Sequence, residues 1–129
     1  EKGFTRVSCT LTRLDTFAEQ QGIPKVDFMK VDIEGAEMLF LNGAAGFITA
    51  HRPTIYGEFN SGIMPKFGHS FLDVYGFFKE RNYRAFGFAD TLLPHELTDP
   101  SPSTGNAFFV AEEKAESLLQ RVAAARAKR

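Results

Sequence analysis

The sequence predicts an α/β fold with a mostly parallel sheet and an antiparallel final strand. Apolar stretches typical of strands alternate along the chain with stretches of helical periodicity, and alternating strands and helices form parallel sheets. The last two strands are separated by a polar, proline-containing stretch instead, which favours their pairing antiparallel. The 129 residues suit one hydrophobic core, and we expect a single domain over residues 1–129.

The first half of the chain is expected to hold two strands and two helices. Residues Thr5–Thr10 alternate loosely and predict a short strand. The short helix after it can be capped by Asp15 and ended by Gly22 in the left-handed conformation. The next strand is expected over Val26–Ile33, and GAEMLFLNGAAGFITAH predicts one well-buried helix after it.

The second half is expected to continue the alternation. TIYGEF predicts a strand that opens after Pro53, and Ser70–Asn82 predicts an amphipathic helix. YRAFGFAD and NAFFVAEE predict the last two strands, with a flexible connection, DPSPSTG, inside the loop Asp90–Gly105. The tail Lys114–Arg129 predicts a final helix whose last turn carries basic residues.

Composition narrows the classes of partner and compartment. The net charge of −1 gives no electrostatic argument for nucleic acid or a membrane surface as partner, and no apolar run is long enough to span a bilayer. One cysteine, Cys9, excludes a disulfide within the chain, and we expect a cytoplasmic protein. The chain begins with Glu instead of Met, so we expect an N-terminal part to precede it.

Acidic and polar residues follow two consecutive predicted strands. Asp32 and Glu34 lie at the end of the first strand, and Glu58 and Asn60 lie at the end of the second. Ligands of open α/β sheets bind outside the carboxyl ends of the strands. If the two strands are neighbours, these four side chains line one crevice, and we expect a ligand there.

A structural explanation of the same carboxylates stands beside the functional one. Glu34 and Glu37 lie at a helix start, where negative charge offsets the macrodipole by roughly 0.3–1 kcal/mol, and Gly35 can serve a tight turn. The structural reading is favoured for Glu37 and the functional one for Asp32; Glu34 and Glu58 are undecided. Oxygen ligands suit Mg²⁺ or Ca²⁺, but the spacing is not specific and no metal is expected.

His69 follows the strand that ends in Glu58, near the mouth of the same crevice. Histidine titrates near neutrality, so His69 is a candidate base. The alternative is a solvated or helix-capping histidine. Cys9 is expected to pack in its strand as a small hydrophobe.

The residues Lys30–Glu37, KVDIEGAE, belong to a longer pattern. It begins with Leu14-Asp15 before a short helix and continues through Gly43-Ala44 and Pro53 to a strand that ends in Glu58. This pattern resembles the C-terminal half of FkbM-family methyltransferases. The resemblance covers roughly Arg6–Asn60 well and rests on element order beyond Ser61.

The resemblance implies a partial Rossmann-like methyltransferase sheet and S-adenosylmethionine (SAM) as cofactor. The acceptor would be a small-molecule hydroxyl, such as that of a sugar or natural product. Asp32, Glu58 and His69 would be catalytic, with Asp32 as the first candidate for the base or for orienting the acceptor. Asp32 and Glu34 would contact the cofactor, and Glu34 and Asn60 the substrate.

The resemblance also implies that a part is missing from this chain. Family members bind SAM mainly through an N-terminal half with a glycine-rich turn after the first strand, and this sequence has no such turn. GAAG at Gly43–Gly46 lies in a predicted helix and is no substitute. The Val26–Ile33 strand would then be an exposed edge, which favours a homodimer through it or cover from the N-terminal segment. The alternative functions are a non-catalytic self-associating module and, more weakly, a metal-dependent hydrolase.

Overall fold

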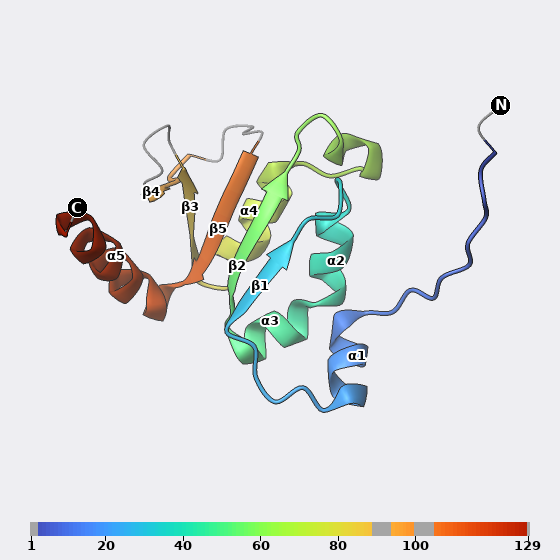
Figure 1. Ribbon diagram of the computed structural model, residues 1–129, viewed down its shortest axis with the longest axis horizontal. Coiled ribbons are helices and arrows are strands. Elements are labelled where there is room, and N and C mark those ends of the chain that lie inside the picture. Colours follow the sequence, from blue (N-terminus) through green and yellow to red (C-terminus); the bar gives the residue numbers. More distant parts are fainter. Residues whose placement is uncertain (1–2, 89–93, 100–104, 129) are drawn as a thin grey trace.

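The computed structural model describes residues 3–88, 94–99 and 105–128 and shows one mixed sheet with helices on both faces (Figure 1). The sheet has five strands in the order β1-β2-β5-β3-β4. The strands are β1 (Phe28–Val31), β2 (Thr54–Phe59), β3 (Tyr83–Phe88), β4 (Pro94–Glu96) and β5 (Gly105–Ala111). The α/β class is therefore confirmed.

The expectation of a mostly parallel sheet is wrong. Among the described strands, β1 and β2 are the one pair that is parallel, with Lys30 opposite Tyr56. The last strand, β5, inserts between β2 and β3 and pairs antiparallel with both, and β4 pairs antiparallel with β3. β1, β2 and β3 still run in one direction, but β5 lies between two of them, so it converts their contacts into antiparallel pairs. The antiparallel direction of the final strand is confirmed.

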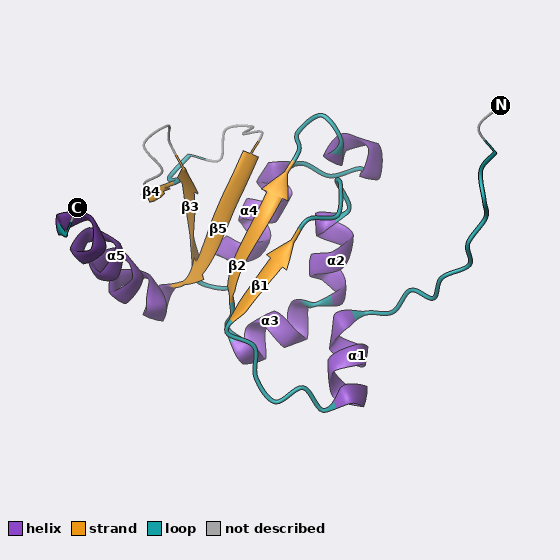
Figure 2. Ribbon diagram, viewed as in Figure 1, coloured by secondary structure: helices purple, strands orange, loops and turns teal. Residues whose placement is uncertain are grey.

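Helices lie on both faces of the sheet (Figure 2). On the first face, α2, α3 and α4 pack their apolar residues against the strands, and α1 packs against α2 and α3. On the second face, α5 is the one helix of the described residues that packs against the sheet. The helices are α1 (Leu14–Gln21), α2 (Glu37–Gly43), α3 (Ala45–His51), α4 (Phe71–Lys79), α5 (Glu112–Ala127) and the 3₁₀ turn η1 (Met64–Phe67).

Phenylalanine dominates the core on the first face. Phe109 of β5 is fully buried; its ring stacks on Phe78 of α4 at 4.0 Å between centroids and meets Phe59 of β2 edge-on at 5.7 Å. Phe71 completes this group at 5.3 Å from Phe59. Aromatic pairs at these separations stabilise beyond the area they bury, by about 0.5–1.5 kcal/mol each.

The predicted strand over Thr5–Thr10 is wrong. The segment is extended but forms no strand, and Phe4, Val7 and Cys9 are exposed (Figure 1). A strand needs a neighbour to satisfy its backbone groups, and no described strand lies beside this segment. An alternating sequence pattern is therefore not sufficient to predict a strand here. The expectation that Cys9 packs in a strand is also wrong.

The single helix expected after the first strand is two helices. α2 ends at Gly43 and α3 starts at Ala45, with a break at Ala44. Asp15 accepts hydrogen bonds from the amides of Gly46 (3.3 Å) and Phe47 (2.7 Å), and so caps α3. It lies inside α1, so the expectation that Asp15 caps its own helix is wrong, whereas Gly22 does end α1 in the left-handed conformation.

Other element boundaries are shorter than predicted. The strand expected over Val26–Ile33 is confined to β1, and the helix expected over Ser70–Asn82 to α4. β4 was not predicted, and it lies inside the loop Asp90–Gly105. The flexibility expected for DPSPSTG concerns residues 100–104, which lie outside the described part of the chain.

Candidate functional site

The turn that follows β1 has an unusual backbone. Glu34 has a φ of 54° and Gly35 a φ of 99°, both in the left-handed region, which side chains other than glycine rarely adopt. A Cβ atom at Gly35 would come within 2.7 Å of the Ile63 side chain and 3.1 Å of Phe67. The turn therefore packs closely against the η1 segment, and only glycine fits at position 35.

The buried side chain of Glu37 stabilises this turn. Its side chain is completely buried at the start of α2, and Oε1 accepts a hydrogen bond from the Gly35 amide at 3.1 Å. Among the described residues Oε2 has no hydrogen-bond partner. The contact with Gly35 supports the structural reading that the sequence favoured for Glu37.

Charged side chains cluster on the second face of the sheet, at the ends of β1 and β2. Lys30 donates to Asp32 Oδ2 at 2.9 Å. This hydrogen bond is the main cause that raises the Lys30 pKa, the negative charge of Asp32 adds to it, and Glu58 raises it slightly further. Asp32 thus pairs with Lys30, and Glu58 lies on the same face of the neighbouring strand.

In the described part of the chain, the other polar residues near the ends of β1 and β2 form no hydrogen bond or ion pair with Lys30. Glu58 is exposed and lies opposite Asn106 of β5. Asn60 accepts from the Gly62 amide through Oδ1 at 2.9 Å, which closes the turn into η1. The Glu34 carboxylate is exposed and makes no hydrogen bond or ion pair with any described residue.

His69 lies at the junction of η1 and α4. The neighbouring Ser70 and Asp73 form a capping box, with the Ser70 amide and hydroxyl both donating to Asp73 Oδ2, at 2.7 and 2.8 Å. These bonds lower the Asp73 pKa, and the nearby His69 adds a smaller effect. Ser70, not His69, caps α4, and within the described residues no hydrogen bond links His69 to Asp32 or Glu58.

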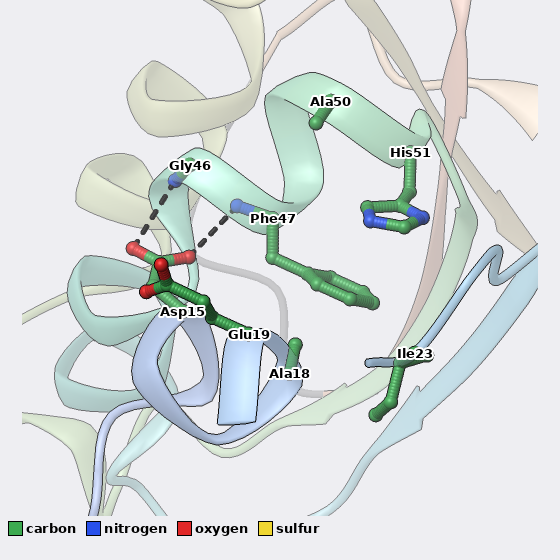
Figure 3. A pocket seen from close by; sticks show the side chains of 8 residues that line it. All are labelled: Asp15, Ala18, Glu19, Ile23, Gly46, Phe47, Ala50 and His51. Carbon is green, nitrogen blue, oxygen red and sulfur yellow. Dashed lines mark hydrogen bonds between the residues drawn. The ribbon is translucent and has the colours of Figure 1, made fainter. Parts of the chain in front are cut away.

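A groove of about 370 Å³ lies between α1 and α3 (Figure 3). Asp15 lines the groove, and its two carboxylate oxygens accept hydrogen bonds from the amides at the start of α3. The His51 ring stacks on the Phe47 ring, with 4.1 Å between the centroids. α3 leads directly into the start of β2, so the groove lies away from the strand ends that carry Asp32 and Glu58. These contacts indicate helix packing, and we place the candidate site at the strand ends.

Sequence reasoning assigned no role to Lys30. A signal was present, because residues two apart on a strand point to the same face, and this places Lys30 beside Asp32. The structural partner of Asp15 was also missed, because it lies 31 residues along the chain at Gly46. No spacing rule connects positions that far apart.

In residues 3–88, 94–99 and 105–128, no three His, Cys, Asp or Glu side chains are grouped so as to hold a metal ion. Likewise, none of the helices in these ranges is both long and apolar enough to cross a bilayer.

Comparison with known proteins identifies the family. Neither the curated proteins nor the solved structures contain a significant match to the chain. The family model described as the methyltransferase FkbM domain matches residues 1–85, a segment that includes Lys30–Glu37 and ends in β3. This match covers more than half of the 129 residues. The chain therefore belongs to the FkbM methyltransferase family.

Proposed function

We propose that this chain forms the acceptor side of a SAM-dependent O-methyltransferase that acts on a small-molecule hydroxyl. The observation that carries the proposal is the placement of Asp32 and Glu58 at the ends of two neighbouring parallel strands. Family membership supports methyl transfer in general. The hydroxyl acceptor and the residue roles are proposals.

Two carboxylates of this chain could bind the ribose of SAM. Asp32 and Glu34 have accessible carboxylates that can accept hydrogen bonds from ribose hydroxyls and balance positive charge. The sequence has no glycine-rich turn between a strand and a helix, and Gly43–Gly46 joins two helices, with Gly46 against the Asp15 carboxylate. We therefore propose that Asp32 and Glu34 hold one side of SAM and that other residues of this chain complete its site.

SAM would supply a methyl group on a sulfonium, and the protein must align the acceptor oxygen with it. Alignment of this kind lowers the entropic part of the barrier. Asp32 is fixed by Lys30 at 2.9 Å, which suits it to orienting the acceptor. Glu58 is exposed at the same strand edge, so we assign it the removal of the hydroxyl proton, and His69 is the reserve candidate.

Cofactor binding is the first test. We expect calorimetric titration of the 129-residue chain with S-adenosylhomocysteine to show saturable binding in the micromolar range. Glu34→Gln should weaken it, and the matched Glu19→Gln on α1, away from the strand ends, should not. No binding at millimolar ligand would overturn the proposal for this chain.

Substitution of Asp32 and of Glu58 should have different effects on turnover with a methyl acceptor. Removing a general base costs about 10²–10⁴-fold, so Glu58→Gln should lower kcat by that factor and leave S-adenosylhomocysteine affinity unchanged. Asp32→Asn should raise the acceptor KM and also weaken S-adenosylhomocysteine binding. Full turnover in both variants would remove both residues from the chemistry.

The alternative, a non-catalytic self-associating module, rests on the open edge of β1. Within the described residues β1 pairs only with β2, and Phe28 is 54% exposed at this edge. An open apolar edge favours pairing with a second copy. Light scattering during gel filtration should then show a dimer that Phe28→Lys abolishes and Leu72→Lys, on exposed α4, preserves. A monomer at all concentrations would contradict the dimer.

A further inference from the structure

A half-enclosed cavity of about 240 Å³ lies between α5 and the second face of the sheet. Every described side chain that lines it is apolar, including Phe86 and Phe88 of β3, Phe108 of β5, and Leu118, Leu119 and Val122 of α5. None of the residues that form the charged cluster at Lys30 takes part. The cavity is therefore distinct from the charged cluster, and its described lining offers no charged partner to a ligand.

The size and lining suit a ring. An apolar cavity of about 150 Å³ lined by aliphatic and aromatic side chains stays free of water and binds benzene. The space under α5 is larger, about 240 Å³, so it has room for one or two fused rings. Polar molecules would gain no hydrogen bond from these walls and would lose those to water.

A row of aromatic side chains connects this cavity with the carboxylates. Phe108 lies 5.2 Å from Phe88 inside the cavity and 4.6 Å from Tyr56 outside it, measured between ring centroids. Tyr56 lies opposite Lys30. Glu58 lies opposite Asn106, which makes Phe108 its diagonal neighbour across the two strands. Diagonal neighbours are about 7–8 Å apart, so Glu58 lies beside the Phe108 wall of the cavity.

We propose that the cavity binds the ring of a small aromatic or alicyclic alcohol, and that this alcohol is the methyl acceptor. Binding of the ring rests on the cavity alone. Identification of the alcohol as the acceptor rests on the proposed function, since it requires the hydroxyl to reach Glu58. The acceptor class is thereby narrowed from any hydroxyl compound to one with an apolar ring.

The test uses 2-naphthol as the probe and the whole chain with labelled methyl groups. We expect saturable NMR shifts at the methyls of Leu118, Leu119 and Val122, and contacts between naphthol protons and the Tyr56 ring. Leu119→Trp should fill the cavity and weaken binding at least tenfold. Leu72→Trp is the matched control on exposed α4 and should leave the affinity unchanged.

The outcomes separate the cavity from the methyltransferase proposal. Shifts that do not saturate, or that centre on the exposed Leu39 and Leu72, would overturn the cavity site, and the unmutated chain decides this even if Leu119→Trp does not fold. Naphthol binding without contacts to Tyr56 would overturn its identification as the acceptor. Naphthol binding without S-adenosylhomocysteine binding would sustain the cavity and overturn methyl transfer by this chain.

Discussion

The two faces of the sheet differ in how completely they are covered. On the first face, three helices bury residues of β1, β2, β3 and β5 in one continuous core. On the second face, α5 covers a small cluster around Phe86, Val110 and Ala115. Beyond α5, Lys30 and Glu58 are exposed to solvent. Adjacent residues of one strand therefore lie either in the large core of the first face or on the partly covered second face.

This difference separates stability from binding. The strand residues on the first face are buried and mostly apolar, so they stabilise the fold. The second face carries the carboxylates, the aromatic row and the cavity under α5, at the cost of incomplete packing. We infer that substitutions on the first face act on the free energy of unfolding and those on the second act on affinity.

The largest expected effect comes from two neighbouring phenylalanines of β5. Phe109 is fully buried on the first face, so Phe109→Ala should lower the free energy of unfolding by about 3–5 kcal/mol. Phe108 is half-buried on the second face, and Phe108→Ala should cost about 1–2 kcal/mol. Urea denaturation of both variants measures the difference. Equal losses would mean that the two faces contribute alike and would refute the comparison.

Much of the first face was predictable from sequence. Periodicity located α4 and the strands that flank it, because their apolar residues follow one local period. The direction of the pairs was not predictable in the same way. β5 crosses to a position between β2 and β3, and this choice depends on tertiary packing that no local pattern encodes.

The candidate site was predictable where it depends on neighbouring strand ends. Asp32 and Glu58 could be placed at one edge because β1 and β2 pair in parallel. The cavity under α5 could not be found, since it joins β3, β5 and α5 through side-chain packing. The hydrogen bond of Glu37 to Gly35 was likewise hidden, because carboxylates at helix starts usually face solvent.

The turn beneath η1 tests whether the site depends on the core. A methyl group at position 35 would meet Ile63 at 2.7 Å with φ at 99°, so Gly35→Ala should cost about 2–3 kcal/mol and reduce S-adenosylhomocysteine binding. Gly22 is also left-handed but has open space around it, and Gly22→Ala should cost about 1 kcal/mol. Thermal denaturation compares them. Equal costs would show that backbone strain alone, without crowding, limits the turn.

The attachment of α5 should depend on pH. Arg52 binds Glu113 through two hydrogen bonds of 2.9 and 2.7 Å, the first cause of a Glu113 pKa lowered from 4.5 to about 2. The folded state therefore binds fewer protons, so this stabilisation is complete above pH 4.5 and is lost as the pH falls toward about 2. Glu113 is 54% exposed, which limits the contribution to about 1 kcal/mol or less.

The matched pair for this ion pair is Glu113→Gln and Glu116→Gln, one turn further along α5. At pH 7 the first should destabilise by up to about 1 kcal/mol and the second by less than about 0.5 kcal/mol. The gap between wild type and Glu113→Gln should close near pH 2. A gap that persists there would mean that packing, and not charge, anchors the start of α5 on the second face.

The smallest expected effect is a gain on the first face. Gly76 lies inside α4, and a Cβ atom there would meet no heavy atom within 4 Å. Replacing an unconstrained helix glycine with alanine restricts the unfolded chain, so Gly76→Ala should stabilise by about 0.5–1 kcal/mol. Because α4 covers the first face, this gain should leave 2-naphthol and S-adenosylhomocysteine affinities unchanged. A changed affinity, measured by calorimetry, would show that the covered face also controls the binding face.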